Sequence, residues 1–420
     1  MNKRLLVLPL LVFVSLFAKA QFTVDVAVYN LLNFPSSQPD RTDHLAAIID
    51  TLEPDIFMVC ELDAQSGVND ILTQSLNTNG RTQYAAATWQ PNQSTGGNLT
   101  QMLFYNQNLF TLDAQQVYTT DLRDINRYTL TAKTTDVGTD PLTLEVFVTH
   151  LKAGSGAQNP NNEARRLLEV QTFQAALTTI PPTSRVIFAG DFNLYSSSES
   201  AYQAILDSNN AIQMEDPIQT PGAWNSNSSF ASIHTQSTFT NQTGNDHIQD
   251  SNGDGDGALG GMDSRFDFIM TSSNLLTDPT LQYVPGSYDA VGNNGNCYND
   301  AVNDINCTGT WSQAFREELF NMSDHLPVVL QLSSNKILSI PEFTRSNVAL
   351  EATLVNESIA LTNLPAGNQS VRVFDVTGRE LLVTDTNTLD AGALYVGELP
   401  SGLYYVRLGD VSSTLKFIKN

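Results

Sequence analysis

The feature that most constrains the fold is a series of short apolar runs, separated by helical patterns and polar loops, between residues 22 and 332. The strand-like runs are 23–29, 56–60, 102–105, 144–149, 186–189, 266–270 and 327–332. Helical periodicity fits 43–52 and 162–178, with inward faces predicted to carry Leu45, Ile48, Ile49 and Leu52, and Leu167, Leu168, Val170 and Phe173. Such alternation predicts an α/β domain in which helices cover the sheets.

The motif AGDFNLY, residues 189–195, follows a predicted strand and places Asp191 and Asn193 two positions apart. On extended backbone, side chains two apart point to one face, so both could converge on one target. Gly, Asp and Asn after an apolar run are also ordinary turn chemistry. The motif alone therefore fits a turn and a site equally well.

Other predicted strands end or begin with polar residues in the same way. These residues are Asn30, Asn33, Glu61, His150, Asp267, Asp324 and His325. Each has an ordinary explanation when taken singly, as a cap, a turn residue, a salt bridge or a hydrogen-bonded histidine. Their joint occurrence at strand ends favours a common site.

The order of these motifs resembles the endonuclease/exonuclease/phosphatase superfamily, which includes DNase I-like nucleases, abasic-site endonucleases, sphingomyelinases and inositol polyphosphate phosphatases. The resemblance covers about residues 22–332, and its most specific elements are GDFN and SDHLPV. The YN-x-x-NF start and the HLKA motif, followed by an Arg-bearing helix, are most similar to bacterial extracellular nucleases. The resemblance implies a four-layer αββα sandwich with the site at one end of the paired sheets.

The resemblance also implies a metal site. Glu61 is implied as the principal ligand, with Asn30 and Asp324 close to the metal. Hard carboxylate oxygens suit Mg²⁺ or Mn²⁺, and such a cation neutralises a phosphodiester that would otherwise repel a nucleophile.

The remaining residues receive catalytic roles from the same resemblance. Asp191 would orient or deprotonate the attacking water, and Asn193 would hold water and phosphate in line. His325 would contact the scissile phosphate, with Asp267 holding its ring and favouring the charged form. His150 would lie across the phosphate, and no acidic partner for it can be identified from the sequence.

The stretch DSNGDGDG, residues 250–257, resembles the first half of a calcium-binding loop in its spacing of Asp250, Asn252, Asp254 and Asp256. The position of the bidentate Glu is occupied by Gly261, which does not support an EF-hand, although Asp263 could substitute. A structural Ca²⁺ site and an acidic loop both remain open.

The N-terminus predicts a secreted protein. Residues 1–20 contain Lys3 and Arg4, an apolar run over 5–17 and an Ala-Lys-Ala cleavage pattern, as in a signal peptide. The run is short for a membrane span, and we expect no stable membrane insertion. The net charge of −23 disfavours a tight DNA binder of the repressor kind, but not an enzyme that grips phosphate through metal ions.

The three cysteines fit export. Cys297 and Cys307 lie in a Gly/Asn-rich stretch and predict a short surface disulfide. Cys60 lies inside the apolar run IFMVC and predicts a buried free thiol.

A second domain is predicted at the C-terminus. The catalytic domain covers residues 21–334, a linker covers 335–345, and a small all-β sandwich covers 346–420. The segments VRVFDVTGREL, LPSGLYYVRL and STLKFIKN resemble the C-terminal sorting domain of type IX secretion. An adhesion or carbohydrate-binding sandwich is the alternative.

The sequence thus predicts a secreted, monomeric, metal-dependent phosphodiesterase, a nuclease acting on extracellular DNA or RNA, with the type IX secretion machinery as its export partner. The alternatives are a sphingomyelinase-like or inositol-phosphate hydrolase, and a pseudo-enzyme that binds a surface ligand. The pseudo-enzyme is disfavoured because the expected metal ligands and the Asp-x-Asn pair are all present.

Overall fold

The structure is a computed structural model that describes residues 22–154, 161–240, 247–339, 348–364, 369–390, 392–408 and 414–420. The chain divides into two compact units, with the boundary between Leu338 and Ser339. The predicted signal peptide, residues 1–20, lies outside the described residues, as do residues 340–345 of the predicted linker.

The first sheet of the large unit has seven strands in the order β11-β13-β1-β2-β4-β3, with β12 also paired to β13. The strands are β1 Phe22–Phe34, β2 Ile56–Leu62, β3 Tyr84–Ala86, β4 Thr100–Asn106, β11 Gln282–Tyr283, β12 Asp289–Ala290 and β13 Val328–Ser334. Strand β1 runs parallel to β2 and antiparallel to β13.

The second sheet has six strands in the order β5-β6-β7-β8-β10-β9. The strands are β5 Phe110–Tyr118, β6 Ile125–Ala132, β7 Thr143–His150, β8 Arg185–Asp191, β9 Met214–Glu215 and β10 Asp267–Ser272. Strand β7 runs parallel to β8, and β10 runs antiparallel to β8.

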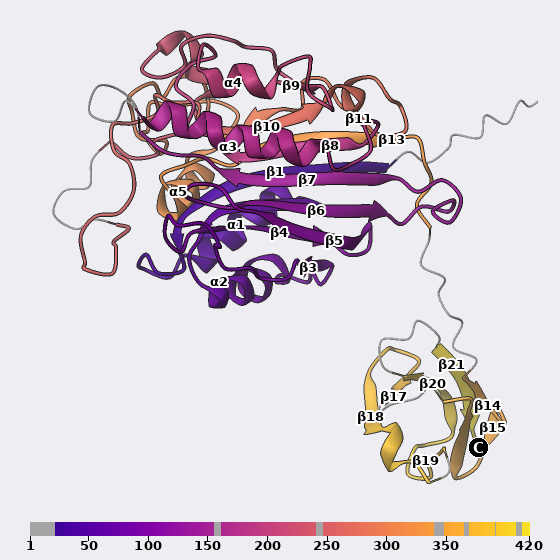
Figure 1. The fold of residues 1–420 in the computed structure, drawn as a ribbon. Helices are drawn as coiled ribbons and strands as arrows, with labels where there is room; N and C mark the ends of the chain where they lie inside the picture. Colours follow the sequence, from indigo (N-terminus) through magenta and orange to yellow (C-terminus); the bar gives the residue numbers. More distant parts are fainter. Residues whose placement is uncertain are drawn as a thin grey trace, which may run out of the picture. The chain divides into compact units, whose positions relative to one another are not determined.

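The two sheets pack face to face between helices, and this confirms the predicted four-layer αββα sandwich (Figure 1). One hydrophobic core joins their inner faces, through Val28 and Met58 on one sheet and Val146 and Ile187 on the other. The helical segments are α1 Thr42–Leu52, α2 Gln65–Asp70, the π-helix η1 Ile71–Leu76, α3 Asn162–Leu177, α4 Ser200–Ile205, the 3₁₀ helices η2 Ser228–Ile233 and η3 Ser273–Leu276, and α5 Gln313–Met322. Helices α1 and α5 pack against each other, and α3 packs against α4. Because the central strands are buried on both faces, they read as continuous apolar runs.

Helix α3 differs from its predicted packing at Leu168, which is 57% exposed. The buried stripe follows Arg166, Glu169, Val170 and Phe173. Two polar residues can face inward because each finds a partner: Arg166 pairs with Glu199 at 2.7 Å, and Glu169 accepts the backbone N–H of Lys152. The prediction took every leucine as inward and missed these buried polar contacts.

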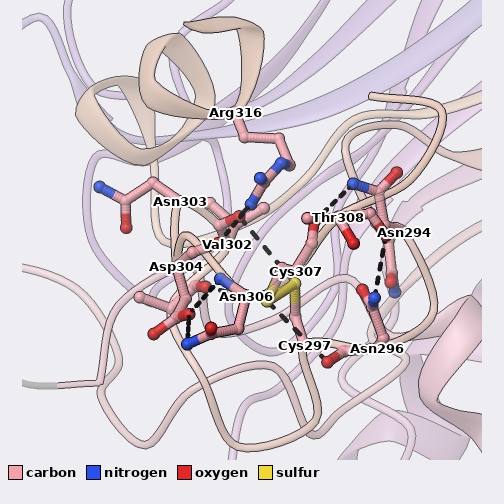
Figure 2. Close-up of a disulfide and its surroundings, with 12 residues drawn as sticks. Asn294, Asn296, Cys297, Val302, Asn303, Asp304, Asn306, Cys307, Thr308 and Arg316 are labelled. Carbon is pink, nitrogen blue, oxygen red and sulfur yellow. Dashed lines mark hydrogen bonds between the residues drawn. A yellow bond between two sulfur atoms is a disulfide. The ribbon is translucent and has the colours of Figure 1, made fainter. Parts of the chain in front are cut away.

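The predicted disulfide between Cys297 and Cys307 is present, but both cysteines are 1% exposed and pack in the core, so its predicted place on the surface is wrong. Cys60 is a buried free thiol as expected. Figure 2 shows the loop that the disulfide closes, with Arg316 from α5 directed at it. The buried Arg316 guanidinium donates to the carbonyls of Val302 and Asp304, and so fastens this loop to α5.

The small unit contains a three-stranded sheet, β14-β16-β19, and a five-stranded sheet, β15-β21-β20-β17-β18. The strands are β14 Ala349–Leu350, β15 Leu354–Val355, β16 Ser358–Thr362, β17 Ser370–Asp375, β18 Glu380–Asp385, β19 Ala393–Tyr395, β20 Gly402–Leu408 and β21 Thr414–Lys419; a 3₁₀ turn, η4, covers Thr386–Thr388. Both sheets contribute to one apolar cluster, through Ile359 and Leu394 on one and Val373 and Phe417 on the other. In the described residues of the chain, no helix is long and apolar enough to cross a membrane.

Candidate active site

The strand directions bring the predicted site residues to one edge of the paired sheets. The C-terminal ends of the parallel strands and the N-terminal ends of their antiparallel partners meet at that edge. On the six-stranded sheet, His150 is paired with Asp191 across β7 and β8, and Asp191 with Asp267 across β8 and β10. Three neighbouring strands therefore present an imidazole and two carboxylates side by side.

Asn30 links the two sheets at this edge. Its buried amide donates to Glu61 Oε1 at 3.0 Å and to Asp191 Oδ2 at 3.1 Å, while its own oxygen accepts the backbone N–H of Leu32. Glu61 lies where the β1–β2 register shifts, with a left-handed φ of 59°. Its second oxygen accepts the backbone N–H of Asn33 at 3.1 Å. A strained backbone held this firmly is typical of a functional site.

The GDFN motif is both a turn and part of the site. Strand β8 ends at Asp191, and Asn193 has a left-handed φ of 50°, so the expectation of continuous extended backbone is wrong. Asp191 Oδ1 accepts the backbone N–H of Asn193 at 3.0 Å, and this local bond competes with strand extension. The turn leaves Asp191 Oδ2 directed at Asn30, while the Asn193 amide donates to the Leu151 carbonyl at 3.3 Å.

His325 is held by one contact at its ring and one at its backbone. Its Nδ1 lies 2.7 Å from Asp267 Oδ2, the contact that the resemblance implied. The backbone N–H of His325 donates to Ser323 Oγ, and that hydroxyl donates to the carbonyl of Asn30 at 2.7 Å. Ser323 thereby ties the segment before β13 to the end of β1.

His150 has no comparable acidic partner. Its Nε2 lies 3.3 Å from Asp191 Oδ2, and its Nδ1 lies 3.8 Å from Glu61 Oε1. Within the described part of the chain, Nδ1 makes no hydrogen bond although it is buried. The structure therefore places His150 between Asp191, on the neighbouring strand β8, and Glu61, on β2 of the other sheet. Neither contact fixes the tautomer of the ring.

Burial raises the pKa values of three carboxyl groups at this edge. Burial raises the pKa of Glu61, and the Asp324 carboxylate raises it further. The pKa of Asp324 is likewise raised by burial. The pKa of Asp191 is raised to about 7 by burial, opposed by His325 and reinforced by Asp267 and Glu61. Burial is therefore the main cause of the raised pKa values, and neighbouring carboxylates add to it.

The two histidines have opposite charge preferences. Burial alone would lower the pKa of His325, but Asp267, Asp324 and Asp191 outweigh burial and hold the pKa well above its usual value. Burial, reinforced by Arg123, lowers the pKa of His150 well below its usual value. His325 is therefore the charged imidazole of the site and His150 the neutral one.

The donor set fits a divalent cation. Among the described residues, ligand atoms of two triplets lie within 4.8 Å of one another: Glu61, His150 and Asp191, and Asp191, Asp267 and His325. A bound cation would offset the mutual repulsion of these carboxylates. Asp324 belongs to neither triplet, and its Oδ2 accepts the backbone N–H of Ala258 at 2.7 Å. Its raised pKa still links it electrostatically to Glu61.

The calcium-like loop does not bring its four predicted ligands together. Asp250 Oδ1 accepts the backbone N–H groups of Asn252 and Asp254, a local turn arrangement. Asp256 instead accepts from the Asn33 amide at 3.0 Å and from the Ser37 hydroxyl. This contact fixes the loop beside the end of β1.

Sequence reasoning missed Gln236, which contacts both His325 and Asp324. It also left Asn33 outside the site, although the Asn33 backbone donates to Glu61. Gln236 lies in a polar stretch without periodicity, so nothing local marks it. Arg165 and Arg166, which the sequence left unassigned, pair with Asp121 and Glu199.

Three solved structures illustrate what the fold is similar to. TDP2 from D. rerio, complexed with a single-strand DNA product, is 16% identical, covering 74% of this chain and 98% of that chain, with a TM-score of 0.44. An endonuclease/exonuclease/phosphatase family protein from Bacteroides thetaiotaomicron is 15% identical, covering 76% and 97%, with a TM-score of 0.43. The human Nocturnin catalytic domain with bound sulfate is 16% identical, covering 74% and 97%, with a TM-score of 0.42.

The comparison with curated proteins found no match. The family model described as Endonuclease/Exonuclease/phosphatase family matches residues 27–325, which is more than half of the 420 residues. The match runs from β1 to His325 and so includes every strand end that contributes to the site. The chain belongs to the Endonuclease/Exonuclease/phosphatase family and is a hydrolase of phosphate esters.

Proposed function

We propose that this protein is a secreted, divalent-metal-dependent nuclease that hydrolyses DNA or RNA by attack of water on the phosphodiester. The observation that carries the proposal is the Asn30 amide, which holds Glu61 on one sheet and Asp191 on the other within hydrogen-bond distance. This contact keeps the carboxylate that would bind the metal close to the carboxylate that would activate the water.

Glu61 would be the principal ligand of the cation, with Asp324 and Asn30 close to it, and the Asn30 amide N–H groups would hold Glu61 and Asp191 in position. Carboxylate and amide oxygens suit Mg²⁺ or Mn²⁺, which take only a few protein ligands and keep several waters. When bound, such a cation supplies Lewis-acid neutralisation of the phosphate oxygens and of the charge on the leaving oxygen. The Glu61 side chain is 14% exposed, whereas that of His150 beside it is 2% exposed.

Asp191 and Asn193 would position the attacking water. Asp191 Oδ2 is fixed by Asn30 and lies 3.3 Å from His150 Nε2, so its direction is set by two neighbours. A carboxylate oxygen with a fixed direction can accept a proton from a water placed in line with the phosphate. Asn193 contributes its backbone N–H to Asp191 and keeps that carboxylate from rotating.

The two histidines would divide the remaining work. His325, with Nδ1 on Asp267, would present the proton on its Nε2 to a phosphate oxygen. His150, with an unpartnered Nδ1 in the described structure, would lie on the opposite side and hydrogen-bond the leaving oxygen or a phosphate oxygen. These roles need no movement of the strands that carry the two rings.

Export is the second part of the proposal. The N-terminal pattern at residues 1–20 favours secretion, and the three C-terminal segments favour the type IX machinery as the export partner. A disulfide between Cys297 and Cys307 supports an oxidising compartment. Deletion of residues after 340 should leave the protein in the periplasm of a type IX host with its hydrolase activity intact. Normal export of the truncated chain would contradict the sorting role.

Parallel hydrolysis of plasmid DNA, RNA, sphingomyelin and inositol phosphates tests the catalytic proposal directly. Each substrate is incubated with Mg²⁺ and with EDTA, using wild type, Glu61→Gln and, as a matched surface control, Asp113→Asn on the exposed side of β5. We expect cleavage of nucleic acid by wild type and by Asp113→Asn that EDTA abolishes. Cleavage of sphingomyelin or inositol phosphate alone would replace the nuclease proposal by a lipid or inositol-phosphate hydrolase, and no cleavage of any substrate would favour a surface-binding pseudo-enzyme.

A further inference from the structure

The segment around Gln236 joins the two sheets at the edge that carries the site. The backbone N–H of Gln236 donates to the Ser264 carbonyl at 3.1 Å, and its own carbonyl accepts the N–H groups of Asp263 and Ser264, both at 2.9 Å. On its other side Gln236 forms a bridge to His325. The backbone of this residue is therefore fixed between the start of β10 and the segment before β13.

The neighbours of Gln236 strengthen that attachment. Thr235 Oγ1 accepts the backbone N–H of Asp267 at 3.1 Å, and the Thr235 carbonyl accepts the N–H of Leu326 at 2.7 Å. Residues Thr235 and Thr238 are buried, whereas Gln236 is only half-buried. The backbone is thus rigidly held, and the Gln236 side chain is the part of this segment that is open to the site.

The side-chain amide of Gln236 lies against Nε2 of His325, the ring nitrogen that does not contact Asp267. The Gln236 Nε2 lies 3.4 Å from Asp324 Oδ2 and 2.6 Å from His325 Nε2. Both nitrogens carry hydrogen when the ring is charged, so the charged ring favours rotation of the amide and an acceptor oxygen beside His325 Nε2. Because His325 Nδ1 is committed to Asp267, Nε2 is the ring atom that a substrate phosphate would contact. The amide therefore lies where a phosphate oxygen must lie when His325 engages a substrate.

We propose that Gln236 is a ligand of the substrate phosphate and helps to select diesters over monoesters; this inference rests on the proposed phosphodiesterase function. When a phosphate oxygen takes the place beside His325 Nε2, the fixed backbone keeps the Gln236 amide within reach. Rotation of the side chain then turns its N–H toward the same phosphate, so His325 and Gln236 hold two non-bridging oxygens. Without substrate, the same amide contacts His325 and Asp324.

The selectivity follows from charge. Asp191, Asp267 and Asp324 surround His325, and each is at most 4% exposed. A phosphodiester brings one negative charge to this place, whereas a phosphomonoester brings about two near neutral pH. A neutral amide can hydrogen-bond a phosphate oxygen but cannot neutralise the second charge of a monoester. A lysine at this position would supply that missing positive charge.

Kinetics with bis(para-nitrophenyl) phosphate and para-nitrophenyl phosphate test the inference. We compare wild type, Gln236→Ala and Gln236→Lys in Mg²⁺, with Asn225→Ala as the matched control. The Asn225 amide donates to the side chain of Ser264 at 2.8 Å, so its loss loosens the same segment without removing the amide that faces His325.

We expect Gln236→Ala to raise the KM for the diester about tenfold or more with a much smaller change in kcat, as for loss of one hydrogen bond to a charged group. Gln236→Lys should raise the ratio of monoester to diester kcat/KM about tenfold or more over wild type. Asn225→Ala should leave the KM and the ratio unchanged. An unchanged KM and ratio in both Gln236 variants, with only a lower melting temperature, would show a purely structural role and overturn the inference.

Calorimetric binding of inorganic phosphate in Mg²⁺ separates this inference from the proposed function. If wild type hydrolyses no diester, the proposed function fails, and the binding measurement still decides the role of Gln236. We expect the Kd for phosphate to weaken about tenfold in Gln236→Ala relative to wild type and to Asn225→Ala. Equal Kd values in all three proteins, or no binding by wild type, would contradict a phosphate ligand at Gln236.

Discussion

Two clusters of buried charge lie two residues apart in sequence, where β10 begins, and they differ in how their charges are matched. Arg265 donates through both terminal nitrogens to Asp216, at 2.8 and 2.9 Å, and both residues are at most 2% exposed. The guanidinium also lies over the Phe268 ring, 4.1 Å from its centre. Asp267, two residues later and the first residue of β10, belongs instead to the site around His325.

The difference separates a stabilising cluster from a functional one. At Arg265 one cation meets one anion through two hydrogen bonds, the arrangement that compensates the burial of charge. At the site, Glu61, Asp191 and Asp324 are buried with raised pKa values, and a single charged imidazole opposes them. Carboxyl groups whose pKa values are raised by burial are typical of a functional site, and a bound cation would stabilise their charged forms. Changes at the site should therefore affect activity, and changes at Arg265 should affect stability.

Glu61→Gln should produce the largest effect. The substitution removes the anionic ligand, while the single amide oxygen can still accept from one of its two donors, Asn30 or Asn33, so hydrolysis should fall about a thousandfold or more. The free energy of unfolding should stay within about 1 kcal/mol of wild type, because a repulsive charge is also removed. Paired measurements of kcat/KM and of urea unfolding check both statements. Retained activity at saturating Mg²⁺ with unchanged metal affinity would remove Glu61 from the metal site.

Asp216→Asn should produce the reverse pattern. It leaves the Arg265 guanidinium buried with a reduced countercharge, which should cost about 3–5 kcal/mol of unfolding free energy. The molecules that remain folded should hydrolyse substrate at a near-normal rate, since Asp216 touches no site residue among its described contacts. A large loss of kcat in fully folded protein would contradict this separation, because Arg265 and Asp216 would then contribute to catalysis.

Asp191→Asn should lower kcat about a hundredfold or more while KM changes little, as expected when water orientation and base assistance are lost together. Asn193→Ala should act in the same direction, and the double variant should lose less than the sum because both residues act on one water. Steady-state kinetics on the three variants measure this. Near-normal turnover by Asp191→Asn, or a defect confined to KM, would reduce the GDFN motif to a turn.

Cys297→Ser should produce the smallest change. Opening a ten-residue separation removes about 2–3 kcal/mol of unfolding free energy on chain-entropy grounds. The closed loop also accepts from Arg316 and donates, through the Val302 N–H, to the Thr238 carbonyl beside Gln236. We therefore expect a moderate rise in KM in addition to the loss of stability. Gel assays of cleavage, run well below the melting temperature, distinguish the two effects, and an unchanged KM would limit the disulfide to stability.

Much of the fold could be predicted because the central strands are buried on both faces and read as plain apolar runs. The hairpin of β5 and β6 was not predicted, since β5 mixes exposed and half-buried residues and carries little pattern. Leu168 was misplaced for the opposite reason: Arg166 and Glu169 occupy the buried stripe of α3 through specific partners that composition does not reveal.

The site divides in the same way. Residues at strand ends, such as Glu61, His150 and Asp191, could be identified because strand direction alone brings them to one edge. Gln236 could not, because its place depends on bridges to Ser264 and His325, which are far from it in sequence. The left-handed conformation of Asn193 was also hidden, since it results from the bond to Asp191.

The central claim is that the unmatched anions at the strand ends bind a divalent cation. Thermal unfolding of wild type, Glu61→Gln and Asp216→Asn with and without Mg²⁺ tests it most directly, because a ligand that binds only the folded state raises the melting temperature. The account predicts that Mg²⁺ raises the melting temperature of wild type and, from a lower starting value, of Asp216→Asn, but not of Glu61→Gln. An equal rise in Glu61→Gln, or no rise in wild type, would contradict it.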